Sequence, residues 1–76
     1  MNLKDAAAVA KQQVADLFAP DSPRNVRLEQ FLYDDHLGVW SLTIGFALPG
    51  RAEEARDYKI VRVSEGDKSV LSVRDP

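Results

Sequence analysis

Residues 39–47 show the clearest hydrophobic alternation in the chain and strongly limit the folds open to it. Four large apolar side chains occupy every second position: Trp40, Leu42, Ile44 and Phe46. Because successive side chains of a strand point to opposite faces, this pattern predicts a strand over about 38–47 with all four on one face. That face has to be covered by another element, so we expect it to form the core.

The N-terminal segment shows the period of an amphipathic helix over about residues 3–18. Its apolar positions fall in one stripe: Leu3, Ala6, Ala7, Ala10, Val14, Leu17 and Phe18. Asn2 is placed to cap the first turn, and Asp5 lies where a carboxylate complements the helix dipole. Pro20 and Pro23 then stop the helix. We expect the stripe to cover the protein's own sheet rather than a partner.

Three further segments have the composition of strands, at about 25–33, 57–64 and 69–74. The connections between successive strands are short enough for antiparallel neighbours. We therefore predict one α+β domain, residues 1–76, with an N-terminal helix packed on a four-stranded antiparallel meander of order 1-2-3-4. In the last hairpin we expect Gly66 to supply a positive φ angle.

The third strand has apolar residues at both parities. Tyr58 and Ile60 point to one side, whereas Val61 and Val63 point to the other. The pattern does not decide which pair faces the helix. A single helix covers only one side of a sheet, so we expect a second copy or a partner protein to cover part of the other side.

Composition narrows the possible functions. The chain has 76 residues, no cysteine and a net charge of −2, and its ten basic residues are scattered along it. This predicts a small folded domain without disulfides and without a nucleic-acid-binding surface. The N-terminus has no secretion-signal pattern, and no segment is long and apolar enough to span a membrane. If residue 1 is the natural start, we expect a cytoplasmic protein.

Asp34, Asp35 and His36 form the most conspicuous polar cluster. A metal site needs at least three converging ligands, and consecutive turn residues point in different directions, so we interpret the aspartates as turn residues. His36 is the only histidine, and no hydroxyl is placed to complete a catalytic triad with it. The single glycine at position 66 makes no phosphate cradle. We therefore expect no enzyme activity, no metal and no cofactor.

The last hairpin, together with the helix and the aromatic-alternating strand, resembles the small PepSY-like domains of bacteria. The residues that carry the hairpin part of the resemblance are Tyr58, Ile60, Arg62, Gly66, Val70, Leu71, Ser72 and Val73. The resemblance implies a noncatalytic role in binding or inhibiting another protein, and it brings no functional residue with it. The topology is also similar to that of cystatins, although their inhibitory Q-x-V-x-G hairpin is missing.

We accordingly predict a small protein-interaction module that self-associates or binds a partner protein through the open sheet face or an edge strand. The residues expected at this interaction surface are Val39, Thr43, Ala47, Glu53, Glu54, Val61 and Val63. One alternative is an inhibitor or regulator of an enzyme that acts through loops 34–38 and 51–56. Another is a small-ligand carrier with an apolar pocket between the helix and the sheet.

Overall fold

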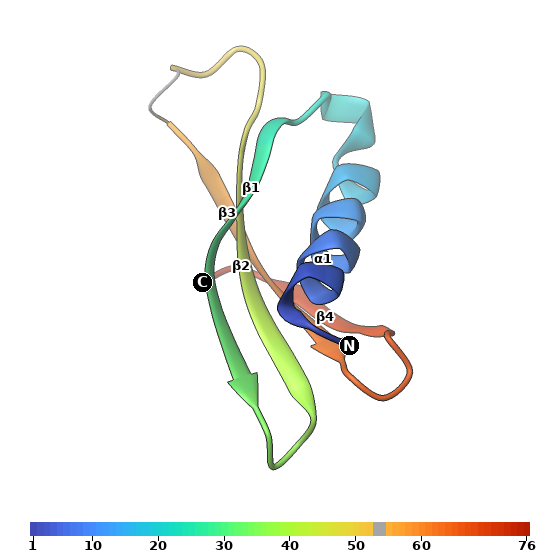
Figure 1. Cartoon of the computed structure of the whole chain (residues 1–76). Coiled ribbons are helices and arrows are strands. Elements are labelled where there is room, and N and C mark those ends of the chain that lie inside the picture. Colours follow the sequence, from blue (N-terminus) through green and yellow to red (C-terminus); the bar gives the residue numbers. More distant parts are fainter. Residues whose placement is uncertain (53–54) are drawn as a thin grey trace.

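The computed structural model describes residues 1–52 and 55–76, in which one helix precedes four strands (Figure 1). The elements are α1 (Leu3–Leu17), the 3-10 turn η1 (Ala19–Asp21), β1 (Arg24–Asp34), β2 (Val39–Ala47), β3 (Asp57–Ser64) and β4 (Val70–Arg74). The bounds of the helix and strands lie within one residue of those expected from the sequence.

The helix begins and ends as its sequence predicts. The Asn2 side chain accepts a hydrogen bond of 2.9 Å from the backbone N–H of Asp5, which satisfies one free donor of the first turn. At the other end the chain tightens into η1, which contains Pro20. Leu17 belongs to the predicted apolar stripe but is exposed, because it lies where the helix gives way to this turn.

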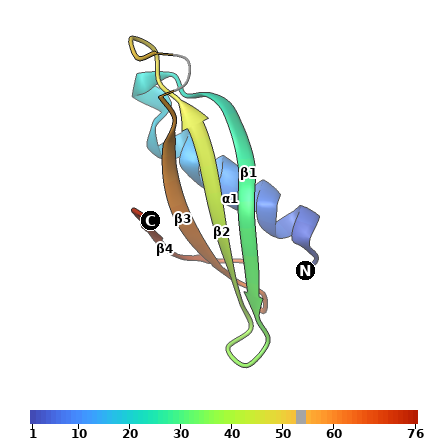
Figure 2. The same cartoon turned by 90° about the vertical axis from the view of Figure 1, so that its left-hand side faces the viewer.

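The four strands form one antiparallel sheet of order β1-β2-β3-β4, which confirms the predicted α+β meander. α1 lies on one face of this sheet, and no element of the described chain covers the other face, as the sheet in front of the helix in Figure 2 shows. In both views the β1–β2 hairpin extends past the N-terminal end of α1 (Figures 1 and 2). Part of the sheet is therefore uncovered on both sides.

The core lies between α1 and the two central strands. Its side chains have no exposed area: Ala6, Ala10, Val14, Leu42, Ile44, Phe46, Val61 and Val63. The alanines let the helix approach the sheet, and Phe18 closes the wide end with its ring centroid 4.8 Å from that of Phe46. Trp40, the fourth large residue of β2, packs against the edge of this cluster.

The two tight hairpins share one turn geometry. In the first, the Gly38 N–H donates to the carbonyl oxygen of Asp34 at 2.8 Å, and in the second the Lys68 N–H donates to Ser64 at 2.9 Å. Both donors have a positive φ, 65° at Gly38 and 60° at Lys68. The expectation of a positive φ at Gly66 is wrong, because this turn closes two residues later and places a lysine in the left-handed region.

Candidate functional site

β1 is the longest strand of the sheet and forms one of its edges. Its pairing with β2 shifts between Arg24 and Arg27 and again between Leu28 and Gln30, so the first part of the strand is bulged. From Gln30 to Asp34 the register with β2 is unbroken. A regular edge stretch presents free backbone donors and acceptors to another strand, whereas a bulged one discourages pairing.

The regular stretch carries a run of exposed apolar side chains. Phe31 is 53% exposed, Leu32 is 68% exposed, and Tyr33 and Leu37 are also exposed. We call Phe31, Leu32, Tyr33 and Leu37 the hairpin-end surface. Leu32 pairs with Ser41 on the open face of the sheet, whereas Phe31 and Tyr33 pair with Leu42 and Trp40 on the helix side. Apolar surface therefore appears on both sides of one strand edge.

On the helix side, three aromatic rings gather at Trp40. The Trp40 ring centroid lies 4.7 Å from that of Tyr33 and 6.4 Å from that of Phe31. The Trp40 indole N–H is enclosed and has no hydrogen-bond partner among the described residues. Rings at these distances stabilise one another, which holds Phe31 and Tyr33 in place at the edge.

Tyr33 also links the two hairpins. Its interaction with the Glu65 carboxylate, which favours the protonated phenol as a donor, raises the pKa of Tyr33 above 10.0, with smaller contributions from burial and the nearby aspartates. The Glu65 N–H donates to the carbonyl oxygen of Gly38 at 2.9 Å. Tyr33 therefore connects the end of the β1–β2 hairpin to the turn that follows β3.

The open face of the sheet is more polar than the predicted interaction surface requires. Val39 is only 7% exposed, and Thr43 and Ala47 are half-buried. Most of their neighbours on this face, taken from the strand register, are polar: Gln30, Ser41, Arg62, Ser64, Ser72 and Arg74. The apolar neighbours are Leu32, Tyr58 and Ile60. Val39, Thr43 and Ala47 do point away from the helix, but they offer little apolar area to a partner.

Val61 and Val63 have no exposed area and pack in the core against α1. This settles the parity of β3 that the sequence left open: Tyr58 and Ile60 point to the open face. Val61 and Val63 therefore cannot contact a partner in this structure, which corrects their place in the predicted surface. Glu53 and Glu54 lie outside the described residues.

The two loops considered for an inhibitor lie at opposite ends of the molecule. Figure 1 shows the 34–38 turn at one end of β2 and the connection from β2 to β3 at the other end. A single narrow cleft of an enzyme could not receive both loops together. The inhibitor alternative that acts through loops 34–38 and 51–56 stays a prediction.

The Asp34 carboxylate accepts hydrogen bonds of 3.0 Å from the backbone N–H groups of both His36 and Leu37. This confirms the interpretation of Asp34 as a turn residue. Within residues 1–52 and 55–76, no three His, Cys, Asp or Glu side chains are grouped in a way that could hold a metal ion.

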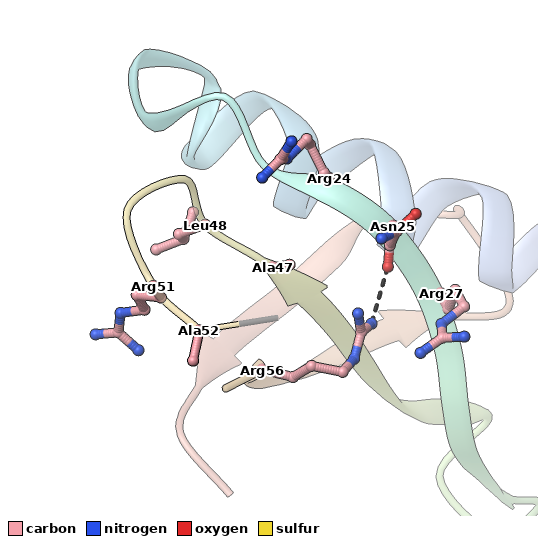
Figure 3. Close-up of a pocket in the computed structure, with 8 residues that line it drawn as sticks. All are labelled: Arg24, Asn25, Arg27, Ala47, Leu48, Arg51, Ala52 and Arg56. Atoms are coloured by element: carbon pink, nitrogen blue, oxygen red, sulfur yellow. Dashed lines mark hydrogen bonds between the residues drawn. The ribbon is translucent and has the colours of Figure 1, made fainter. Parts of the chain in front are cut away.

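A second candidate site lies on the open face, where β1 begins and β2 ends. A pocket of about 470 Å³ is lined by Arg24, Asn25, Arg27, Ala47, Leu48, Arg51, Ala52 and Arg56 (Figure 3). Sequence reasoning missed this arginine pocket because its four arginines come from separate segments that only the fold brings together. No local sequence pattern indicates the arginine pocket.

Arg56 is held across the sheet by a hydrogen bond. Its terminal Nη2 donates to the backbone carbonyl of Asn25 at 2.8 Å, as the dashed line in Figure 3 marks. Asn25 has a positive φ of 54° within the bulged part of β1. The side chain reaches β1 over Gly45, where a Cβ atom would come within 3.1 Å of Arg56 Nη2. Gly45 is therefore the residue that leaves room for Arg56.

A shallow groove lies on the outer side of α1, where the helix meets Val70 of β4. It has a volume of about 400 Å³ and is lined by Ala8, Val9, Gln12, Gln13, Asp16 and Val70. Val9 and Val70 pack against the core cluster, so the groove borders the core where α1 meets β4, and Gln12, Gln13 and Asp16 form its polar rim. The small-ligand carrier stays a prediction.

Comparison of the chain with protein-family models, with curated proteins and with solved structures found no match. Within the part of the chain that the structure describes, no helix has the length and apolar character needed to cross a membrane. Fold and surface geometry are therefore the basis for a functional proposal.

Proposed function

We propose that this protein is a noncatalytic interaction module that works as a homodimer, formed by antiparallel pairing of β1 with β1 of a second copy. The observation that carries the proposal is the regular edge stretch Gln30–Asp34, which has exposed apolar side chains on both faces. An edge of this kind is a template for another strand, and burial of the apolar side chains would stabilise the pair.

A second copy is the partner that this stretch fits. The bulge-free residues 30–34 are centred on Leu32, so a two-fold axis at Leu32 pairs the whole stretch with itself. In this register Leu32 faces its counterpart on the open side, and Phe31 faces Tyr33 of the second copy on the aromatic side. Gln30 then lies opposite Asp34, where an amide can donate to a carboxylate.

The expected dimer is weak. Five residues of each strand bury less area than a standard interface of about 1,600 Å², so the dimer should dissociate on dilution. The net charge of −2 per chain adds little repulsion. Dimerisation would join two four-stranded sheets into one continuous sheet and leave the other edge, β4, free.

Light scattering coupled to size exclusion tests the proposal. We expect the mass to rise with concentration toward twice the 8.5 kDa of one chain. Leu32→Lys should abolish this rise, because it places two charges opposite each other at the dimer axis. Leu71→Lys is the matched control, because Leu71 is 51% exposed on the other edge strand. A wild-type protein that stays monomeric at millimolar concentration would contradict the proposal.

Cross-linking tests the register. The chain has no cysteine, so Leu32→Cys introduces a single thiol. Side chains directly opposite in an antiparallel pair have Cβ atoms about 4.5–5.5 Å apart, close to the spacing that a disulfide needs. Mild oxidation should join the Leu32→Cys protein into a covalent dimer much faster than the Leu71→Cys protein. Equal rates for the two variants would rule out a two-fold axis at Leu32.

A further inference from the structure

The arginine pocket concentrates positive charge in a chain that is negative as a whole. Four of the ten basic residues line it, although the net charge of the protein is −2. No acidic side chain is among its lining residues in the described part of the chain. Like charges placed together destabilise a fold unless something offsets them, so this arrangement needs a physical reason.

Two of the four arginines have carboxylate partners among the described residues. Arg51 Nη1 lies 2.9 Å from an oxygen of Asp57, and Arg27 Nε lies 3.6 Å from an oxygen of Glu29. The Arg27 side chain is 60% exposed, so its ion pair is weak and easily exchanged. Arg24 forms no hydrogen bond or ion pair within residues 1–52 and 55–76, so its guanidinium group is available to a ligand.

Arg56 gives the pocket a fixed wall. Its hydrogen bond to the Asn25 carbonyl and its passage over Gly45 hold the guanidinium group in one place. Its Nε–H is enclosed and has no hydrogen-bond partner among the described residues, so one donor of the guanidinium group is unsatisfied. A charged group held in position before binding loses little conformational entropy when a ligand arrives.

We propose that the arginine pocket binds the phosphate group of a small organic phosphate. Guanidinium groups match phosphate oxygens in geometry and form strong charge-assisted hydrogen bonds with them. Arg24 makes the direct contact with the phosphate, Arg27 and Arg56 add positive charge from the same pocket lining, and Leu48 and Ala47 offer an apolar wall to the rest of the molecule. The volume of about 470 Å³ is within the range of small-molecule sites.

An NMR titration with inorganic phosphate and with phenyl phosphate tests the site. Both should shift the backbone signals of residues 24–27 and 47–52 and the side-chain Nε–H signals of the pocket arginines. Phenyl phosphate should bind more tightly, because its ring buries apolar surface against Leu48. Equal affinities would show that the site takes a free phosphate ion rather than an organic phosphate and would overturn that part of the proposal.

Arg24→Gln is the decisive variant, because the Arg24 side chain has no hydrogen bond or ion pair to lose among the described residues. It should weaken phosphate binding about tenfold, the effect of one charge-assisted hydrogen bond. Arg62→Gln is the matched control, since Arg62 lies on the same open face outside the pocket. Absence of phosphate-induced shifts, or equal losses in the two variants, would overturn the proposal.

Discussion

Gly45 and Arg56 make a coupled pair whose energetics can be worked out from the structure. A Cβ atom at position 45 would lie 2.9 Å from Glu29 Cγ, 3.0 Å from Tyr58 Cε1 and 3.1 Å from Arg56 Nη2. Glu29 and Tyr58 are exposed and can turn away, but the Arg56 guanidinium group is tethered to the Asn25 carbonyl. We therefore expect Gly45→Ala to displace Arg56 and break this hydrogen bond.

The expected cost follows from two opposing terms. Overpacking costs about 1–3 kcal/mol, and replacing a strand glycine by alanine returns roughly 0.5–1 kcal/mol. Gly45→Ala should thus lower the free energy of unfolding by about 1–2 kcal/mol. Arg56→Ala should cost a similar amount through loss of its hydrogen bond, about 1–2 kcal/mol. In the double variant the new methyl group enters space that Arg56 has left, so the two costs should not add.

Urea unfolding of the wild type, both single variants and the double variant measures this coupling. We expect the double variant to be more stable than the sum of the single effects by about 1 kcal/mol. Gly66→Ala is the control, because an added Cβ would meet no atom within 4 Å beyond its chain neighbours and the φ of Gly66 is not positive. It should change stability by less than about 0.5 kcal/mol. Additivity within about 0.5 kcal/mol would refute the role assigned to Gly45.

Three further predictions concern the turns and the charged connection. Lys68→Gly should raise stability by about 1 kcal/mol in urea unfolding, because it relieves a φ of 60°. Hydrogen bonds from the Ser69 hydroxyl and N–H lower the pKa of Asp67 below 3.8, so they stabilise the fold above that pH and are lost as the pH falls through the lowered value. The stability difference between wild type and Asp67→Asn should therefore shrink in acid titrations. The double variant Glu53→Gln, Glu54→Gln should tighten phosphate binding in the NMR titration. Both glutamates lie within three positions of Arg56 in the sequence, and negative charge near the pocket opposes the binding of an anion.

The elements and their order could be predicted because each is encoded locally. The helical stripe, the N-cap at Asn2 and the alternation from Trp40 to Phe46 each fix a short segment, and short connections then leave one simple topology. Which side chains of β3 face the helix was not encoded locally. Both faces of that strand are apolar, so only packing against α1 decides that Val61 and Val63 lie inside.

Neither candidate site could be predicted from local sequence patterns alone, and the reasons are related. The switch of apolar parity near Gln30 is typical of a bulge or of a two-sided strand, and the pairing of β1 with β2 does shift between Leu28 and Gln30. The shift between Arg24 and Arg27 shows no clear signal in the sequence, yet it lies where Asn25 presents its carbonyl to Arg56. The exposed run of Phe31, Leu32 and Tyr33 has apolar residues at both parities, which is also typical of a buried strand. Only the position of β1 at the edge of the sheet distinguishes the two cases.

The bulges also divide β1 into two parts with separate roles. Residues 24–29 carry the irregular backbone and the arginine pocket, whereas residues 30–34 carry the pairing edge. At about 3.3 Å per residue, Arg24 lies roughly 26 Å along the strand from Leu32, well beyond the screening length of about 8 Å at physiological ionic strength. In an antiparallel dimer centred on Leu32 the two pockets fall at opposite ends and stay open. Leu32→Lys should therefore leave phosphate binding intact and Arg24→Gln should leave the dimer intact, so each variant serves as the control for the other proposal.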